Sequence, residues 1–261
     1  MHKRYSTDFK VVDIHSLNAS CYQIVLKHPE SLPTVAPGQF VQVQLPDSAT
    51  SYLRRPISIH DADFEANTLT LLIRKAGKGT ELLSHVEVGD TINLLYPLGN
   101  GFNLNLEQIG KQPLLIGGGV GIAPLFMAAK ALKQSGANPV VLLGARNEAD
   151  LLKKDEFAKV TETQCTTEDA SFGTKGFVTD HVYMKENIHQ FTSIIVCGPM
   201  PMMRAIARVA EAENIPCQVS LENKMACGIG ACLCCVTETT DGHNTCVCTQ
   251  GPVFDSKDVK W

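Results

Sequence analysis

The sequence predicts three consecutive parts: a six-stranded β-barrel over residues 1–101, an α/β domain with a parallel sheet over 102–221, and a small cysteine-rich domain over 222–261. Three observations support this division. Short apolar runs separated by turn signals fill the first part, and units of strand, glycine turn and helix fill the second. Most of the cysteines then crowd together after residue 226.

The barrel is predicted from short runs rich in β-forming residues. Apolar and polar residues alternate from Phe40 to Leu45, which is typical of a half-buried strand. One helical insertion, GTELLSHV at 79–86, has Leu82 and Leu83 available to pack inward. The expected strands cover residues 5–15, 21–28, 39–45, 56–60, 68–75 and 90–97.

The α/β domain begins where the period of the pattern changes. A strand at 113–121 leads into a helix at 121–136, a strand at 139–146 into a helix at 147–160, and a strand at 193–198 into a helix at 199–214. Strands joined by helices of this length form parallel sheets with right-handed crossovers and helices on both faces. The segment 217–223 is expected to be a final strand. This pattern predicts a nucleotide-binding domain.

Composition excludes several classes of function. The chain of 261 residues has 23 basic and 27 acidic residues without a basic block, which argues against nucleic acid or an anionic membrane as a partner. It has no apolar run of the roughly 18 residues that span a bilayer, and its first residues lack a signal-peptide core. We therefore expect a cytoplasmic protein, in which clustered cysteines indicate metal binding and not disulfides.

The cysteine spacing is the most specific chemical signal. Cys227, Cys232 and Cys235 follow the CxxxxCxxC spacing of plant-type [2Fe-2S] sites, and Cys248 is a suitable distant fourth ligand. The small residues between them let backbone N–H groups turn toward sulfur. A zinc site is the alternative, although zinc knuckles usually pair two CxxC motifs, and thiols that bind nothing are another.

The choice of ligands among the neighbouring cysteines stays open. Cys234 and Cys246 lie beside the preferred residues and are competitors. Cys235 is preferred for its two-residue gap from Cys232, and Cys248 for the turn-forming QGP that follows it. The sequence predicts the site more sharply than its exact ligand set.

Two segments of the barrel part suit a flavin dinucleotide. Arg55, Pro56, Ile57 and Ser58 combine a cation for a pyrophosphate with a backbone that is free to bond an isoalloxazine edge. A charged edge strand is the alternative interpretation of this motif. The later segment LLIRKAGKGT adds Arg74 and a Gly-Lys-Gly-Thr helix start that includes Gly79 and Thr80, which suits further phosphate contacts.

Two glycine turns of the α/β part suit a nicotinamide dinucleotide. The first contains Gly117, Gly119 and Gly121 and opens a helix, although it is not a regular GxGxxG. The second contains Cys197, Gly198 and Pro199 and is aimed at the same edge of the sheet. Packing alone can explain one such turn, but two favour a ligand. Arg146 leaves the choice between NAD and NADP open.

The order of these motifs resembles the ferredoxin reductase superfamily of FAD and NAD(P) enzymes. With the ACGIGACLCC loop and the GPVF tail, residues 5–255 resemble the electron-transfer subunits of NAD-linked, type B dihydroorotate dehydrogenases. Cys234 departs from the glycine common at that position. The resemblance implies cluster ligands at Cys227, Cys232, Cys235 and Cys248, and FAD contacts at Arg55, Pro56, Ile57, Ser58, Leu72, Ile73, Arg74, Gly79 and Thr80.

The resemblance also implies a function in de novo pyrimidine (UMP) biosynthesis. A partner subunit holding FMN oxidises dihydroorotate, and the electrons pass through the cluster and FAD to NAD+. The flavin is needed because a nicotinamide exchanges two electrons and a [2Fe-2S] cluster one. A heterotetramer with two copies of each subunit is implied, and this chain needs no dihydroorotate site of its own.

The apolar residues of the cysteine loop, Met225, Ala226, Ile229 and Leu233, are the expected partner surface. Sister reductases of the same architecture are the close alternative: the small subunit of a ferredoxin:NADP oxidoreductase, or the diaphorase subunit of a hydrogenase or sulfide dehydrogenase. A zinc-stabilised binding module is the remote one.

Overall fold

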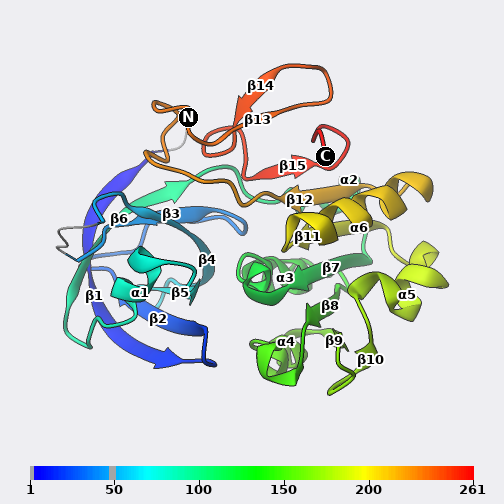
Figure 1. Ribbon diagram of the computed structural model, residues 1–261, viewed down its shortest axis with the longest axis horizontal. Helices are drawn as coiled ribbons and strands as arrows, with labels where there is room; N and C mark the ends of the chain where they lie inside the picture. Colours follow the sequence, from blue (N-terminus) through cyan, green and yellow to red (C-terminus); the bar gives the residue numbers. More distant parts are fainter. Residues whose placement is uncertain (1–2, 47–50) are drawn as a thin grey trace.

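The computed structural model describes residues 3–46 and 51–261. Residues 1, 2 and 47–50 of the segment expected to form the barrel lie outside this range. Figure 1 shows a barrel and a sheet domain side by side, with the C-terminal segment lying across the same side of both. This arrangement confirms the predicted fold class.

The first part is a closed six-stranded barrel whose interior is a single apolar core. Helix α1 (Lys78–Leu83) is inserted between the last two strands, and Leu83 is fully buried against that core whereas Leu82 is half-buried. In spatial order the strands are β1 (Tyr5–Ser16), β2 (Cys21–Lys27), β5 (Thr68–Arg74), β4 (Arg55–Asp63), β3 (Phe40–Val43) and β6 (Thr91–Leu98), which returns to β1.

The second part is built on a seven-stranded sheet. A short helix, α2 (Leu106–Ile109), leads into it from the barrel. The strands in spatial order are β10 (Thr174–Lys175), β9 (Glu162–Thr167), β8 (Val140–Ala145), β7 (Pro113–Gly118), β11 (Ser193–Cys197), β12 (Cys217–Ser220) and β15 (Val253–Asp255). Six of them run parallel, and β15 is antiparallel to β12.

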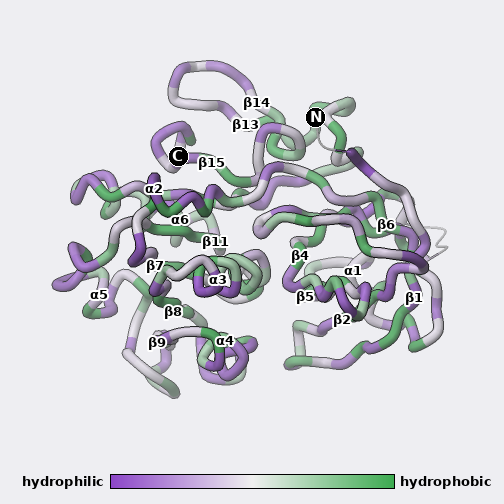
Figure 2. Tube along the Cα trace, turned by 180° about the vertical axis from the view of Figure 1, so that it is seen from behind, coloured by the Kyte–Doolittle hydropathy of each residue, from purple (hydrophilic) through white to green (hydrophobic). Residues whose placement is uncertain are grey.

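Helices cover both faces of this sheet, as the sequence predicted. Helices α3 (Leu125–Gln134) and α4 (Lys154–Val160) lie on the face toward the barrel, and α5 (Val182–Lys185) and α6 (Met200–Ala212) lie on the other (Figure 1). The central strands are coloured mainly as hydrophobic in Figure 2. Alternate residues of these strands therefore enter two separate cores.

The structure corrects the second predicted helix and adds elements that the sequence did not predict. Residues 147–160 are not one helix, because Lys153 has a left-handed backbone (φ 57). A short turn, η2 (Glu148–Asp150), precedes α4 there. Strand β9 was missed because its alternating threonines lack an apolar run. The remaining turns are η1 (Gly119–Ile122), η3 (Val178–Asp180) and η4 (Ile188–Gln190).

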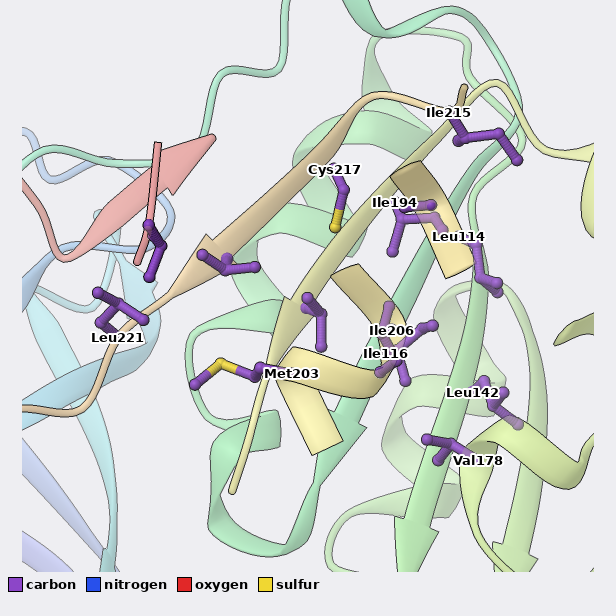
Figure 3. Packing of buried hydrophobic residues seen from close by; sticks show 14 of the residues in the cluster. Leu114, Ile116, Leu142, Val178, Ile194, Met203, Ile206, Ile215, Cys217 and Leu221 are labelled. Atoms are coloured by element: carbon purple, nitrogen blue, oxygen red, sulfur yellow. The ribbon is translucent and has the colours of Figure 1, made fainter. Parts of the chain in front are cut away.

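The cysteine-rich segment is packed onto the sheet domain. It forms a hairpin of β13 (Val236–Glu238) and β14 (Asn244–Cys246), and its last strand, β15, extends the sheet beyond β12. Cys235, Val247 and Cys248 belong to the core shown in part in Figure 3, which also contains Met203 and Ile206 of α6. The expected domain limits at 101 and 221 stay predictions.

No helix of residues 3–46 and 51–261 is long and apolar enough to span a bilayer.

Candidate cofactor sites

The two segments predicted to bind FAD phosphates meet at Arg55 and Gly79. A Cβ atom on Gly79 would lie 2.5 Å from Arg55 Nη2, so only glycine leaves room for the guanidinium there. Arg55 also donates to Ser51 Oγ at 2.7 Å and to the Leu53 carbonyl at 2.5 Å. The structure therefore holds a half-buried cation against the start of α1, which suits a pyrophosphate.

Thr80, in the first turn of α1, fixes the turn that precedes the helix. Thr80 Oγ1 accepts the N–H groups of Ala76 (2.9 Å) and Gly77 (3.2 Å), and the Tyr22 hydroxyl donates to the Thr80 carbonyl at 2.6 Å. Burial raises the pKa of Tyr22 by disfavouring the phenolate, and the negative charge of Glu81 adds to this, so the hydroxyl stays protonated. The barrel thus holds the turn in place through an uncharged hydroxyl.

The other predicted FAD residues divide by burial. Pro56, Ile57 and Ser58 are half-buried, whereas Leu72 and Ile73 are 2% and 1% exposed, with their side chains in separate apolar cores. A flavin can reach the latter two only through their backbone. Arg74 is exposed and lies at a cavity between the two domains. The geometry brings Arg55 and Gly79 together and places Arg74 at the cavity, and all three stay predicted FAD contacts.

A cavity of about 620 Å³ separates the barrel from the carboxyl ends of the sheet strands. This is the position at which parallel α/β sheets bind dinucleotides. The Thr166 hydroxyl at this cavity is buried and has no partner among the described residues, and such a group suits a polar ligand. Lining residues include Asn18, Ser20, Cys21 and Arg74 from the barrel, and Gly118, Gly119, Arg146, Asp150, Glu168 and Pro199 from the sheet domain.

The two predicted glycine turns lie in contact. A Cβ atom on Gly121 would lie 2.6 Å from Gly198 Cα, and one on Gly118 would lie 2.6 Å from Met202 Sδ. Gly119 and Pro199 line the cavity, whereas Gly117, Gly121, Cys197 and Gly198 support it from behind. The prediction that both turns share one edge is confirmed.

Cys197 is a buried, uncharged thiol at the end of β11. Burial raises its pKa well above the ordinary value, and the negative charge of Glu222 adds to this, while a hydrogen bond with Ser220 lowers it in part. The thiolate is therefore absent at neutral pH. Cys197 is therefore excluded as a charged contact to a ligand. It is an uncharged, buried residue of the second glycine turn.

Asp150 is an acidic residue at the cavity that the sequence analysis did not single out. Its Oδ2 pairs with Arg146 Nη2 at 2.9 Å, and its Oδ1 accepts from Asn18 Nδ2 at 3.1 Å. Asn147 caps the turn by accepting the Asp150 N–H at 3.1 Å. The spacing of four residues between Arg146 and Asp150 was the available signal. Because residues 147–160 were predicted to form one helix, the sequence analysis did not place Asp150 at the nucleotide site. The Arg146 charge facing the cavity is thus neutralised.

The cysteine loop points N–H groups at sulfur, as predicted. Cys227 Sγ accepts from the N–H groups of Ile229 and Cys232, both at 3.4 Å, and Cys235 Sγ accepts from the Cys248 N–H at 3.4 Å. Burial acts to raise the pKa of Cys227, but these N–H groups lower it more, to about 6. A thiolate there suits a metal site, and the donor set fits an iron–sulfur cluster.

Left-handed backbone angles shape this loop. They occur at Gly228 (φ 70) and Gly230 (φ 85), and also at Leu233 (φ 58). Cys234, which replaces the glycine common in the resembling family, does not adopt such an angle. Its substitution is therefore compatible with the loop. The strain instead falls on Leu233, where it typically costs about 1–2 kcal/mol.

The four predicted ligands form a buried pair and a more open pair. Cys235 and Cys248 are 2% and 1% exposed, whereas Cys227 is half-buried and Cys232 is exposed. Burial raises the pKa of Cys248 to about 12, and the adjacent Cys235 contributes. Within the part of the chain that the structure describes, no three ligands already stand in metal-binding geometry.

Cys246 remains a competitor for the fourth position. Burial and then the nearby Cys235, Cys227 and Cys232 raise its pKa, which places its thiol among the same group. Cys234 is exposed, and its N–H donates to Cys232 Sγ at 3.5 Å. The ligand set therefore stays a prediction, with Cys246 the stronger alternative.

Three stretches of the chain match known domain families. Residues 8–102 match an oxidoreductase FAD-binding domain, residues 115–208 an oxidoreductase NAD-binding domain, and residues 222–260 the iron–sulfur cluster binding domain of dihydroorotate dehydrogenase B. These matches coincide with the barrel, the sheet domain and the cysteine-rich segment. The molecule is therefore an iron–sulfur flavoprotein oxidoreductase with a ferredoxin reductase-like fold.

Relatives along most of the chain narrow this class. A protein of Bacillus caldolyticus is 41% identical over 85% of this chain and 86% of its own, and one of Bacillus pumilus is 37% identical over 99% and 98%. Both are named "Dihydroorotate dehydrogenase B (NAD(+)), electron transfer subunit". The chain belongs to this family of electron transfer subunits.

Solved structures agree with the fold. An NADH-dependent reduced ferredoxin-NADP oxidoreductase matches with a TM-score of 0.86 and 32% identity over 97% of this chain and 90% of that chain. A cytochrome P450 reductase of Amycolatopsis matches with a TM-score of 0.70 and 24% identity over 82% and 68%. The second likeness concerns the fold alone.

Proposed function

We propose that this chain receives electrons from a partner subunit that oxidises dihydroorotate and delivers them to NAD+ through a [2Fe-2S] cluster and FAD. The observation that carries this proposal is the position of the cysteine loop. Its buried pair, Cys235 and Cys248, packs in the core of the sheet domain, whereas Cys232 lies at the surface. The cysteine loop thus reaches from the interior of the sheet domain to the surface, where a partner that donates electrons can approach it.

The residues of this chain bind and position the redox groups. When bound, the cluster supplies one-electron transfer and the flavin links it to two-electron hydride transfer. Arg55 and the turn before α1 hold the flavin phosphates. The two glycine turns in contact with each other let the pyrophosphate of NAD come close to the protein main chain at the edge of the sheet. The proposed ligands of the cluster are Cys227, Cys232, Cys235 and Cys248.

The partner surface is proposed to be the outer side of the cysteine loop. Ile229 and Leu233 are 42% and 62% exposed there, while Met225 and Ala226 are half-buried. An exposed leucine held in a left-handed conformation is expensive and needs a reason. Contact with a partner beside the surface ligand Cys232 supplies one.

The assembly and its location belong to the same proposal. We infer a partner that carries FMN and an assembly of two copies of each subunit. A cytoplasmic location suits the ten cysteines, all of which are free thiols.

The test uses the chain copurified with its partner. Leu233→Asp is expected to weaken the assembly and to abolish dihydroorotate-dependent NAD+ reduction at dilute concentrations, while NADH oxidation with an artificial acceptor persists. Val88→Asp is the matched control, because Val88 is 65% exposed but lies on the barrel. Light scattering gives the stoichiometry. Equal loss of both activities in Leu233→Asp would refute the interface.

A ferredoxin-linked reductase is the second candidate. The 32% identity and 97% coverage of the NADH-dependent reduced ferredoxin-NADP oxidoreductase favour it. The same purified complex decides between the two. Reduction of NAD+ by dihydroorotate supports the first proposal, whereas reduction by ferredoxin without any response to dihydroorotate supports the second.

A further inference from the structure

Gln42 of β3 is a completely buried amide without a partner. Its exposed fraction is 0%, and neither Oε1 nor Nε2 has a hydrogen bond to any residue that the structure describes. Native proteins rarely leave buried amides unpaired, because water solvates them in the unfolded chain. Such a group therefore indicates a polar partner outside the polypeptide.

The side chain lies between the barrel and the cysteine loop. Val41 and Val43 enter the barrel core, so Gln42 between them projects from the outer face of the strand. A Cβ atom on Gly228 would lie 2.7 Å from Gln42 Cγ and 3.0 Å from its Nε2. The amide is thus in contact with the residue that follows the ligand Cys227.

The backbone of Gln42 belongs to the flavin side. Gln42 pairs with Pro56 in the β3–β4 ladder, and its carbonyl accepts from Arg54 Nη1 at 3.2 Å. Pro56 follows Arg55, the proposed phosphate contact. Gln42 therefore contacts the cysteine loop through its side chain, and through its main chain it contacts β4 (Arg55–Asp63), the strand with the proposed FAD contacts and here called the flavin strand.

We propose that Gln42 is a positioning residue that donates its amide N–H to sulfur at the Cys227 corner of the cluster. The inference rests on the proposed cluster site. Cys227 Sγ already receives two backbone N–H groups, and cluster sulfurs accept further donors. A donor in a dry environment favours the reduced cluster, because reduction adds negative charge. Gln42 thereby raises the reduction potential and fixes the loop against the flavin strand.

The test is an EPR-monitored redox titration of the complex carrying Gln42→Leu. We expect iron and FAD content to be retained and the ratio of reduced to oxidised cluster at a fixed potential to fall about tenfold, or about 59 mV for one electron. Gln44→Leu is the matched control. Gln44 lies two residues further along and is exposed, so its substitution should leave the cluster potential unchanged.

Other outcomes remain decisive. An unchanged cluster potential with full iron content overturns the inference, and so does a shift confined to the flavin potential. If Gln42→Leu loses iron, Gln42→Met keeps the length without the donor. A shifted potential with iron and FAD retained in Gln42→Met supports the proposal, whereas an unchanged potential, or iron loss in this variant as well, refutes it. A wild-type complex without a reduced-cluster EPR signal overturns the cluster assignment as well.

Discussion

The flavin strand and the cysteine loop both offer groups to an anionic cofactor, but they are built differently. Arg55 is held by Ser51, Leu53 and the packing of Gly79, which a closed barrel brings together from separate segments. In the cysteine loop, the N–H bonds to Cys227 come from the next few residues of the same loop. The barrel thus preorganises its site, whereas the loop depends on what it binds.

Burial shows the same contrast. The barrel has a continuous apolar core behind β4, whereas Cys232, Leu233 and Cys234 are all exposed. The outer side of the loop therefore has little packing of its own, while Cys235 and Cys248 are packed by the fold. Because the flavin site lies on the packed barrel, loss of the cluster should leave it intact.

The largest expected effect is on the cluster itself. Cys232→Ser is expected to lose the cluster completely while FAD stays bound, because the flavin strand belongs to the closed barrel. Iron analysis, the visible spectrum and NADH diaphorase activity measure the two sites separately. Cys234→Ser is the control and should retain iron. Loss of FAD in Cys232→Ser would break the proposed independence of the two regions.

Serine substitutions of the two candidate cysteines test the fourth ligand. Cys248→Ser should lose the cluster, and Cys246→Ser should retain it. The opposite result would assign the position to Cys246, whose thiol lies among the same cysteines.

The contrast between regions also explains what the sequence could predict. Alternation, glycine turns and cysteine spacing are local signals, and they predicted the barrel, the parallel sheet and the cluster region. The Arg146–Asp150 pair has the spacing of a local ion pair, but its position at the cavity follows from the tertiary arrangement, which brings Asn18 of the barrel against Asp150. The burial of Gln42 was likewise hidden. Strand alternation predicts a polar residue to face solvent, and only tertiary packing places Gly228 over it.

The second effect separates function from fold within the barrel. Arg55→Ala removes a charge-assisted phosphate contact and should weaken FAD binding about tenfold to a hundredfold. Arg54→Ala is the matched control. Arg54 donates to the Gln42 and Asn93 carbonyls, so its loss should lower stability with little change in FAD affinity. Flavin fluorescence titration and thermal unfolding measure the two quantities. Equal FAD affinities in both variants would contradict the assignment of Arg55.

The third effect is the pH dependence of stability, and it concerns the interface between the barrel and the sheet domain. His60 bonds the Ala123 carbonyl at 3.1 Å and stacks on Phe126, and burial, with smaller effects of Lys153 and Lys130, lowers its pKa to about 3. An unfolded histidine titrates near 6.5, so the unfolded chain binds the extra proton between about pH 6.5 and 3. Stability should therefore fall as the pH drops through this window.

The His60 contribution is isolated by substitution. Between pH 7 and 5 its share of the loss is about 2 kcal/mol. His60→Gln keeps a donor for Ala123 but does not titrate, so the pH dependence should be shallower by this amount. Urea unfolding followed by circular dichroism at several pH values provides the measurement. Parallel curves for both proteins would show that His60 does not stay neutral.

The smallest effect tests whether the sheet domain is as preorganised as the barrel. Asp150 neutralises Arg146 beside the cavity, and its carboxylate would repel the 2′-phosphate of NADPH. Asp150→Asn frees Arg146 and should raise the ratio of kcat/KM for NADPH to that for NADH about tenfold, which corresponds to about 1.4 kcal/mol. Diaphorase assays with both nucleotides measure this ratio.

Two further variants decide whether Arg146 causes that change. Glu148→Gln removes an exposed acid of the same turn that faces Lys154 at 3.9 Å, and it should leave the ratio unchanged. Adding Arg146→Ala to Asp150→Asn should abolish the gain, because the freed guanidinium is the group that accepts the phosphate. If the double variant keeps the gain, Asp150 discriminates by repulsion alone, and the Arg146 pair is only a structural contact.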